Sequence, residues 1–515
     1  MSTPGAGTLE TLRKLDKEAR LLEHSAAILS WDQETFMPER AVVERSQQLA
    51  LLQGLVHQRN GSPEVGDALS QFIGDPREQW DPAVASQLRD TLSLEDVAFL
   101  REKHRQYRHA IRIPDELVTA MAEGASRSQG EWVHARRENE YSRFQPWLEK
   151  MVQYNQQLAE HLEYDDQPYD ALLDQYEPGM KTAEVAAIFA SLRGQLVELV
   201  GKIEGSAPVR TNFLATPFPV DLQEQFNNEI VSALGYELDR GRLDRSAHPF
   251  TTTLGSDDVR ITTRYDEMLL LSAIFSTIHE VGHGLYELGV GESLRGTLLA
   301  EGTSLGIHES QSRLWENMIG RSRAFCSHWF PRLQKKFPAQ LGQVSVDQFY
   351  HAANHVERSL IRVEADEVTY GLHIILRFEL EQALINGDVL VRDLPEAWRE
   401  KSKELLGIVP ETDAQGVLQD VHWSMGAFGY FPTYALGNLY AAQFHEVLDR
   451  AVGGVSQLVA AGEYAPILQW LREHIHQYGR VKTAGDLVQD ITGGPLNAQP
   501  FVTYLNDKYG EIYRF

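Results

Sequence analysis

Apolar side chains recur every three or four residues along most of the chain. Residues 9–29 illustrate the pattern, because Leu12, Leu15, Ala19, Leu22 and Ala26 follow the period of an amphipathic helix. We therefore predict a mostly α-helical protein. Further helices are expected over residues 41–56, 86–111, 133–164, 182–204, 222–234, 266–288, 304–318, 346–385 and 434–452.

One region departs from this helical period. Residues 248–254 and 259–265 are rich in β-branched and aromatic side chains, and turn-forming residues 255–258 separate them. This pattern predicts a β-hairpin directly before the helix expected over residues 266–288. An edge strand beside that helix could bind an extended peptide by backbone pairing.

The distribution of glycine and proline indicates the domain organisation. Both residue types are spread between the predicted helices rather than collected in one linker, and we find no repeat of fixed period. A chain of 515 residues is long enough to bury a large core. We expect one large helical domain over residues 1–515.

Charge and cysteine content narrow the functional classes. The chain has 48 basic and 73 acidic side chains and a net charge of −25, which argues against nucleic acid as a partner because binding phosphates requires a basic surface. Cys326 is the single cysteine, so the chain forms no internal disulfide and fits a reducing compartment. Residues 1–7 carry no apolar signal core, and no apolar run approaches the roughly 18 residues of a membrane span. We expect a cytoplasmic protein that does not bind membranes, with Cys326 buried and unreactive.

The sequence His-Glu-Val-Gly-His at residues 279–283 follows an apolar run over residues 269–278. On a helix, His279 and His283 lie one turn apart on the same face, so both imidazoles can reach one zinc ion while Glu280 acts on its water. A chance match in a chain of this length has odds on the order of one in twenty, but a buried helix requires partners for its His and Glu. Gly282 and Gly284 weaken the helix, which indicates that substrate or another helix approaches closely. The motif predicts a zinc-dependent peptidase.

A third metal ligand must come from outside this motif. The metzincin extension needs Gly at 286 and His at 289, where this chain has Tyr286 and Gly289. A carboxylate from a second helix is the other solution. Glu309 lies in a strongly helical segment and Glu301 lies nearer the preceding turn, so spacing favours Glu309 only slightly. The less favoured candidates are Glu287 and Glu292.

Several further sequence blocks occur in order along nearly the whole chain. They are Ser-Trp-Asp-Gln-Glu-Thr-Phe-Met-Pro at 30–38, His-Pro-Phe at 248–250, Asp-Val-Arg-Ile-Thr at 258–262, His-Glu-Ser-Gln at 308–311, Ile-Arg-Val-Glu-Ala-Asp at 361–366 and Gly-Val-Leu-Gln-Asp-Val-His-Trp at 416–423. Together with the metal motif, these blocks make the sequence resemble the carboxypeptidase Taq family of metallocarboxypeptidases.

The resemblance implies a structure and an activity. It implies that Glu309 is the third metal ligand, and that the fold is a mostly helical, neurolysin-like zincin (a gluzincin) with a deep groove and a small antiparallel β-sheet of three strands. It also implies a homodimer that removes single C-terminal residues from peptides with broad preference, disfavouring proline. Zinc is the metal it implies, and cobalt can support activity in some members.

Peptide hydrolysis assigns further roles to residues of these blocks. We expect Glu280 to take the proton of the attacking water and to pass it to the leaving amine. The developing oxyanion needs a donor besides the metal, and His422, Tyr430 and Tyr434 are the candidates. Packing in the core is the alternative for each tyrosine.

A carboxypeptidase must also bind the free carboxylate of its substrate. An arginine fork can donate two parallel hydrogen bonds to that group, and Arg362 is the first candidate and Arg260 the second. The alternatives are an ion pair with Asp366 for Arg362 and a cross-strand pair for Arg260. His248 is expected to bond the substrate backbone, and His308 is expected to support the metal ligands rather than to bind the metal.

Two rival functions remain open from the sequence. One is an endo-acting or dipeptide-releasing peptidase on the same scaffold, because closure of the groove decides which bond is cut. The other is a non-catalytic helical scaffold with a structural metal. Such a scaffold would need a closed site of four ligands, and the sequence shows no fourth ligand near the motif.

Overall fold

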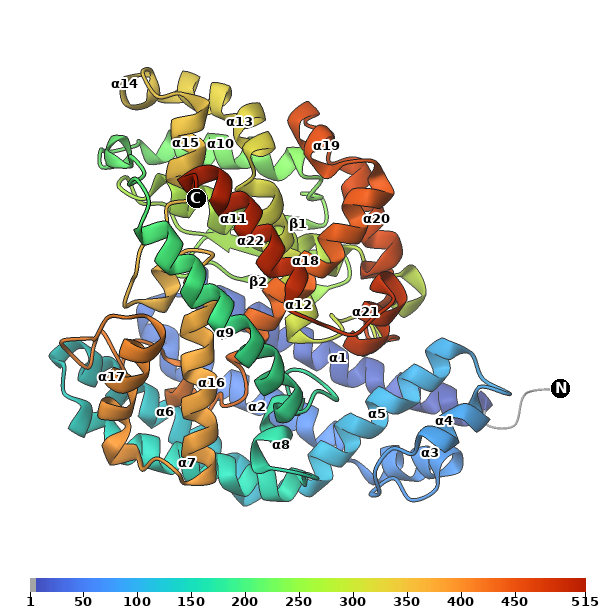
Figure 1. The fold of residues 1–515 in the computed structure, drawn as a ribbon. Helices are drawn as coiled ribbons and strands as arrows, with labels where there is room; N and C mark the ends of the chain where they lie inside the picture. Colours follow the sequence, from blue (N-terminus) through green and yellow to red (C-terminus); the bar gives the residue numbers. More distant parts are fainter. Residues whose placement is uncertain (1–5) are drawn as a thin grey trace.

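The computed structural model describes residues 6–515, and helices dominate it (Figure 1). The first ten α-helices are α1 (Ala6–Thr35), α2 (Val42–Asn60), α3 (Pro63–Ile73), α4 (Pro82–Leu88), α5 (Leu94–Arg112), α6 (Asp115–Glu138), α7 (Tyr141–Leu162), α8 (Pro168–Asp174), α9 (Thr182–Glu204) and α10 (Val220–Ala233). Figure 1 shows the blue and teal helices α1–α8 along the lower side of the molecule.

The metal motif and the remaining helices follow a short stretch of strands. The strands are β1 (Gly241–Arg245), β2 (Thr251–Gly255) and β3 (Asp258–Thr263). The helices are α11 (Leu270–Leu288), α12 (Leu305–Arg313), α13 (Arg323–Lys336), α14 (Pro338–Leu341), α15 (Val346–Ala353), α16 (Tyr370–Asn386), α17 (Leu394–Leu405), α18 (Pro432–Val452), α19 (Val455–Ala461), α20 (Ala465–His474), α21 (Ala484–Thr492) and α22 (Gln499–Tyr513). Short irregular turns include a π-helix, η4 (Leu314–Gly320), and the 3-10 helices η5 (Arg362–Glu364) and η7 (His422–Met425).

Most predicted helices are present, but three are interrupted. The segment 86–111 breaks where the Ser93 side chain caps α5 by accepting from the Asp96 backbone N–H. The segment 133–164 breaks at Asn139, whose left-handed backbone (φ 55°) ends α6. The segment 346–385 contains a loop over residues 354–369, because the Asp366 side chain accepts from the backbone N–H of Val368 and Thr369.

The predicted hairpin is confirmed as β2 and β3, which pair antiparallel. β1 joins the other side of β3 in parallel, so the strand order is β1-β3-β2 and the sheet is mixed rather than wholly antiparallel. β2 is therefore an edge strand with one side free of sheet partners. Ile261 on β3 faces α11, where it approaches Gly284. The preceding residue, Arg260, points to the opposite face of the sheet and lies against Trp31 of α1. The small sheet is thus enclosed between α11 and α1.

Helix α11 crosses the centre of the molecule. Its buried residues occur all round its axis rather than on one stripe, which is typical of a helix surrounded by protein. A Cβ at Gly282 would lie 2.7 Å from the backbone oxygen of Gln311 on α12, and one at Gly284 would lie 2.7 Å from the Tyr236 ring. The close approach that these glycines indicated is therefore made by another helix and by Tyr236.

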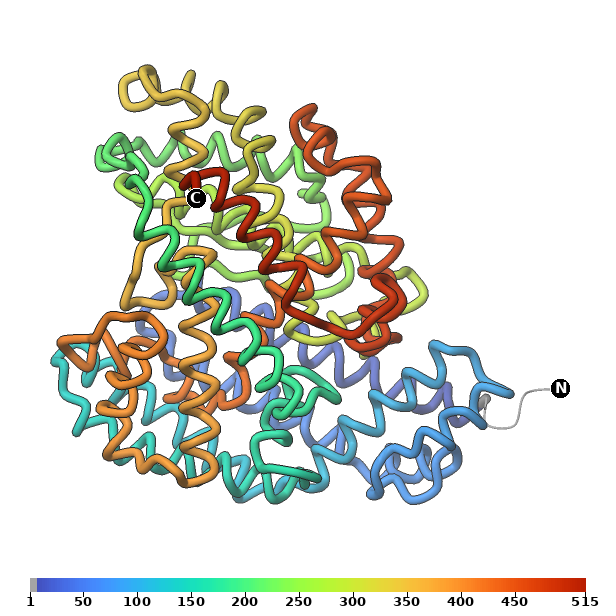
Figure 2. The backbone as a smooth tube through the Cα atoms, in the orientation of Figure 1, coloured from blue at the N-terminus to red at the C-terminus, as the bar shows by residue number. Residues whose placement is uncertain are grey.

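Two hydrophobic cores are formed by the described residues. The larger one joins α6–α22 with the sheet, and the smaller one joins α1, α3 and α5 with the loop over residues 290–299. The tube in Figure 2 shows the orange helix over residues 370–386 running from the middle of the molecule down towards the teal helices at its lower edge. Among the described residues, no helix is both long and apolar enough to cross a membrane.

Candidate active site

Two neighbouring helices bring His279, His283 and Glu309 together. The Glu309 carboxylate oxygen Oε2 lies 3.6 Å from Nε2 of His279 and 3.4 Å from Nε2 of His283. One ligand atom from each of the three residues lies within 4.8 Å of the other two. Of the two candidate carboxylates, Glu309 joins the two histidines in this group, whereas Glu301 pairs with Arg20 and Arg480.

The position of Glu309 follows from the way α12 is built. Ser304 caps the helix by accepting from the Ile307 backbone N–H at 3.1 Å. Gly282 allows α12 to cross α11 in backbone contact, and Gly437 allows α18 to pack on the other side, since a Cβ there would lie 2.5 Å from Cγ of Glu309. Glu309 is consequently held between the metal-motif helix and α18.

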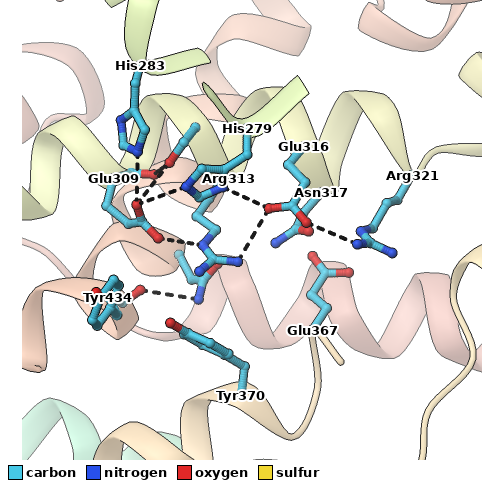
Figure 3. Close-up of polar contacts among 12 residues, drawn as sticks. His279, His283, Glu309, Arg313, Glu316, Asn317, Arg321, Glu367, Tyr370 and Tyr434 are labelled. Carbon is cyan, nitrogen blue, oxygen red and sulfur yellow. Dashed lines mark hydrogen bonds and ion pairs between the residues drawn. The ribbon is translucent and has the colours of Figure 1, made fainter. Parts of the chain in front are cut away.

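Further charged side chains surround this cluster (Figure 3). Nδ1 of His279 lies 2.9 Å from Oε2 of Glu316, so its Nε2 is left to face Glu309. Arg313 donates to Glu309 Oε1 at 2.7 Å, and Arg321 donates to Glu316 Oε1 at 3.0 Å. Glu316 therefore orients His279, and Arg313 orients Glu309.

The electrostatics of the cluster suit metal ligation. Burial, reinforced by the nearby His308, lowers the pKa of His283 to about 3, so its imidazole is neutral. Burial alone would raise the pKa of Glu309, but Arg313 and His279 outweigh it and hold that pKa well below its usual range. Burial alone would lower the pKa of His279, but Glu309 and Glu316 outweigh it and raise that pKa. A divalent metal binds neutral imidazoles and an ionised carboxylate, so at His279 it competes with a proton.

Glu280 lies beside the cluster and is held by the edge strand. Thr251 of β2 donates to Glu280 Oε2 at 2.6 Å, and burial raises the pKa of the Glu280 carboxyl. His308 stacks on His283 with ring centroids 4.4 Å apart, and its Nε2 lies 2.7 Å from Oε1 of Glu287. His308 thus contacts the imidazole of His283 without belonging to the cluster of His279, His283 and Glu309.

A cavity opens beside the free edge of β2. It has a volume of about 460 Å³, and Thr251, Thr252, Thr253 and His308 contribute to its wall. The cavity extends towards α1 and the loop that follows α11, where Arg20 and Glu301 line it. A peptide paired with β2 could therefore lie with its backbone next to Glu280.

Arg362 lies on the other side of the site, in the loop before α16. Its Nε donates to Asp420 Oδ1 at 2.9 Å, and its Nη1 donates to the Tyr370 hydroxyl at 3.0 Å. The ion pair with Asp366 that was the alternative for Arg362 is not formed, because Asp366 accepts from its own loop. The Arg362 guanidinium lies 5.1 Å from the ring of Tyr434.

The three candidate donors form one aromatic group next to Arg362. Nε2 of His422 lies 3.3 Å from the Tyr434 hydroxyl, and the rings of Tyr430 and Tyr434 have centroids 5.3 Å apart. Figure 3 shows Tyr434 directly below Glu309 and Arg313. Burial lowers the pKa of His422 to about 4 and raises the pKa of both tyrosines, so all three groups are neutral at pH 7.

Two predicted substrate-binding residues lie away from this group. Arg260 points to the face of the sheet opposite α11, where it forms a bidentate pair with Asp258 at 2.8 Å and stacks on Trp31. The partner is two residues away on the same strand rather than across strands. His248 is exposed in the turn between β1 and β2, where its backbone oxygen accepts from Ser246.

Three residues of the site were missed by the sequence reasoning. Thr251 lies in the predicted edge strand, and its contact with Glu280 was implied only by the proximity of hairpin and helix. Arg313 and Glu316 follow Glu309 by four and seven residues. An i, i+4 ion pair could have identified Arg313, whereas Glu316 lies in the π-helix η4, whose wider turn the sequence does not signal.

The site meets the requirements of a catalytic metal centre. Two imidazoles and one carboxylate form an open donor set, and within residues 6–515 no other group of three such ligands comes close enough to share an ion. The Glu280 carboxylate, which Thr251 holds by a hydrogen bond, directly follows the first of these histidines. Fold and site together define a helical metallopeptidase of the His-Glu-x-x-His class.

The family follows from comparison with known proteins. Residues 11–509 match the carboxypeptidase Taq (M32) metallopeptidase family, and the chain belongs to that family. It is 43% identical to thermostable carboxypeptidase 1 of Thermus thermophilus, over 99% of this chain and 100% of that protein. It is 38% identical to carboxypeptidase 1 of Bacillus subtilis, over 95% of each chain.

Solved structures agree with this assignment. The M32 carboxypeptidase from Deinococcus radiodurans R1 superposes with a TM-score of 0.93 at 38% identity, over 99% of this chain and 100% of that one. The Pyrococcus furiosus carboxypeptidase superposes with a TM-score of 0.92 at 36% identity, over 98% and 99%. The protein is thus a metallocarboxypeptidase that acts on peptides and uses a divalent metal.

Proposed function

We propose that the protein is a zinc-dependent carboxypeptidase that removes single C-terminal residues from peptides with broad preference, disfavouring proline. The observation that carries the proposal is the pairing of an open His-His-Glu cluster with a buried arginine, Arg362, on the opposite side of the same site. An arginine beside the hydrolytic centre suits the free carboxylate of a substrate, since a guanidinium fork binds a carboxylate through two parallel hydrogen bonds.

His279, His283 and Glu309 hold the metal in this proposal. Nitrogen and carboxylate oxygen ligands suit zinc, and cobalt fits the same donor set. When bound, the metal supplies Lewis-acid polarisation of the scissile carbonyl and of the attacking water.

Glu280 is the general base and later the general acid. Thr251 occupies one of its oxygens, which leaves the other to take the proton of the attacking water. The same carboxyl then gives that proton to the leaving amine. Burial raises the pKa of Glu280 and so makes its protonated form accessible for this second transfer.

His422, Tyr430 and Tyr434 are the donors to the oxyanion. Because burial raises the pKa of both phenols, each keeps its O–H as a donor. The neutral His422 can donate from one ring nitrogen only, and its Nε2 already contacts Tyr434. His422 also orients Tyr434, so the three donors act as one group.

Arg362 anchors the C-terminal carboxylate of the substrate. Asp420 and Tyr370 fix its orientation, and the remaining N–H groups are available to an incoming anion. Arg260 and His248 are left out of this role, because the structure places them on the outer face of the sheet and in an exposed turn.

The proposal extends to assembly and location. The homodimer rests on likeness to the family and is measured by light scattering. A cytoplasmic location is supported by Cys326, which is buried and whose pKa burial raises to about 12, so the lone thiol is protected.

Digestion of paired peptides tests the activity. A peptide with a free C-terminus and its amidated twin are incubated with the enzyme, with and without a chelator, and the products are weighed by mass spectrometry. Stepwise loss of single residues from the free peptide alone, abolished by chelation, is expected. Cleavage inside both peptides indicates an endopeptidase, release of residue pairs indicates a dipeptide-releasing enzyme, and no metal-dependent cleavage indicates a non-catalytic scaffold.

A further inference from the structure

One fully buried carboxylate, Glu381, ties both ends of the loop that joins His422 to Tyr430. Glu381 lies on α16 and is 0% exposed. The indole Nε1 of Trp423 donates to its Oε1 at 2.7 Å, and the backbone N–H of Gly429 donates to its Oε2 at 3.1 Å. Trp423 directly follows His422, and Gly429 directly precedes Tyr430.

Further contacts restrain this loop in addition to its two hydrogen bonds with Glu381. Trp423 and Phe428 stack with ring planes 8° apart, which closes the loop on itself. Gly429 has a φ of +87°, and a Cβ there would lie 2.6 Å from the carbonyl of Leu172 on α8. The position of Tyr430, which precedes α18, is therefore determined by the contacts of Gly429 with α8 and α16.

A buried carboxylate is not an effective way to stabilise a fold, because removing it from water costs free energy. Well-packed apolar residues are often as stabilising as a buried polar network. Burial raises the pKa of Glu381 to about 7, and the bonds from Tyr169, Trp423 and Gly429 oppose that shift. A carboxylate has two oxygens that accept at a fixed separation, whereas an apolar side chain cannot hold two distant donors in register.

We propose that Glu381 is a positioning residue that sets the placement of His422 and Tyr430 around the reacting carbonyl. The inference rests on the proposed function, since it assumes that these two residues act on the oxyanion. A displacement of about 1 Å in such a group costs on the order of 100-fold in rate. Loosening one end of the loop should therefore lower kcat, while the three metal-binding side chains on α11 and α12 keep their positions.

Tyr169 on α8 provides a matched control. Its hydroxyl donates to Glu381 Oε2 at 2.6 Å, so Tyr169→Phe removes a bond to the same buried carboxylate without releasing either end of the loop. A role in stability alone predicts that Glu381→Gln and Tyr169→Phe both lower the melting temperature and leave kcat alike. A positioning role predicts that only Glu381→Gln lowers kcat.

The experiment uses the full-length, metal-loaded enzyme with Glu381→Gln, Tyr169→Phe, Tyr430→Phe and the double variant Glu381→Gln/Tyr430→Phe. Steady-state kcat and KM on one peptide, bound metal per chain and melting temperature are measured for each. We expect Glu381→Gln to lower kcat at least about tenfold, with bound metal unchanged and KM nearly so. Tyr169→Phe should keep kcat within about twofold, and the double variant should lose little more than the worse single variant.

The outcomes separate this inference from the proposed function. If Tyr430→Phe lowers kcat but Glu381→Gln does not, the positioning role is wrong and the proposed function stands. If Tyr430→Phe retains full kcat, the role of Tyr430 in the proposed function is wrong. The inference that Glu381 positions Tyr430 for catalysis is then wrong as well. Should Glu381→Gln fail to fold or lose metal, Trp423→Phe removes one tie only, and full kcat in that variant overturns the inference.

Discussion

The two sides of the site are both buried ion networks, but their charge balance is opposite. On the metal side, Arg313 pairs with Glu309 and Arg321 pairs with Glu316, while the buried Glu280 accepts from Thr251. Metal binding requires neutral imidazoles, and the proposed role of Glu280 as a base requires its ionised form. In that state the three carboxylates outnumber the two guanidinium groups. In the proposed function, a divalent cation completes this network.

On the substrate side the excess is positive. Arg362 and Arg377 share the single carboxylate Asp420, with Nε–Oδ distances of 2.9 Å and 2.7 Å. Burial alone would raise the pKa of Asp420, but the two arginines outweigh it and hold it far below its usual range. One guanidinium charge is left over, and in the proposed function the C-terminal carboxylate of a substrate balances it.

This difference fits the proposed reaction. If a dication binds on one side and the substrate carboxylate on the other, the scissile bond of a C-terminal residue lies between them. Uncompensated buried charge is costly without its ligand. The opposite imbalances therefore favour metal and substrate more strongly than either network would if it were neutral.

The largest effect is expected on the metal side from Glu280→Gln. The amide cannot take the proton of the attacking water, so kcat should fall by about 10³-fold. Bound metal, measured by atomic emission, should stay at the wild-type level because Glu280 is not among the three ligands. A variant that keeps near-normal turnover together with its metal would rule out the general-base role.

The next effect is a loss of stability on the substrate side in Asp420→Asn. Leaving two buried arginines without their carboxylate should lower the free energy of unfolding at pH 7 by about 3 kcal/mol, measured in urea. Because the folded pKa of Asp420 is lowered, its stabilisation is present above the unfolded value near 4 and is lost as pH falls below it. The difference between wild type and variant should shrink below about pH 4.

Asp258→Asn is the matched control for that measurement. Its partner Arg260 is an equally close arginine, but Asp258 is 40% exposed on the outer face of the sheet. Removing this pair should cost under about 1 kcal/mol. Equal losses in the two variants, or a difference that ignores pH, would contradict the account of the Asp420 network.

Arg362→Ala tests the anion side through activity. The loss of a buried anchor for the substrate carboxylate should lower kcat/KM on free peptides by about 100-fold. The preference for free over amidated peptides should disappear with it. Arg260→Ala serves as the control and should leave both quantities near wild type, since Arg260 faces away from the site. An unchanged preference in Arg362→Ala would show that another group anchors the carboxylate.

The smallest effect should come from Glu316→Gln on the metal side. Glu316 orients His279 by accepting a hydrogen bond from its Nδ1–H. Hydrogen bonds that orient a metal ligand in this way are worth about 10- to 100-fold in metal affinity. Zinc titration of metal-free protein should show weaker binding by at least about tenfold. Affinity equal to wild type would mean that Arg313 and the helix contacts alone hold the ligands in place.

The sequence predicted the metal side far better than the substrate side. His279, Glu280 and His283 share one helix, so their geometry follows from helical period alone. Glu309 was left open against Glu301 by spacing, because the crossing of α12 over α11 at Gly282 is a tertiary contact. The residue blocks pointed to it only through likeness to a family.

The substrate side depends on contacts between distant parts of the chain. Arg362 and Asp420 are 58 positions apart, so the sequence offered the nearer Asp366 as partner instead. Arg260 was considered as an anchor because the face on which a strand residue lies follows from the sheet's packing and not from its own neighbours. The helix expected over residues 346–385 failed for a related reason, since side-chain bonds of Asp366 replace the helical ladder there.

Zinc titration into metal-stripped wild type, Glu309→Ala and Glu301→Ala tests most directly where the catalytic cation binds. The account predicts one zinc per wild-type chain, affinity weaker by at least about 100-fold in Glu309→Ala, and unchanged affinity in Glu301→Ala. Tight binding in Glu309→Ala together with weak binding in Glu301→Ala would contradict it, because the cation would then lie outside the cluster of His279, His283 and Glu309.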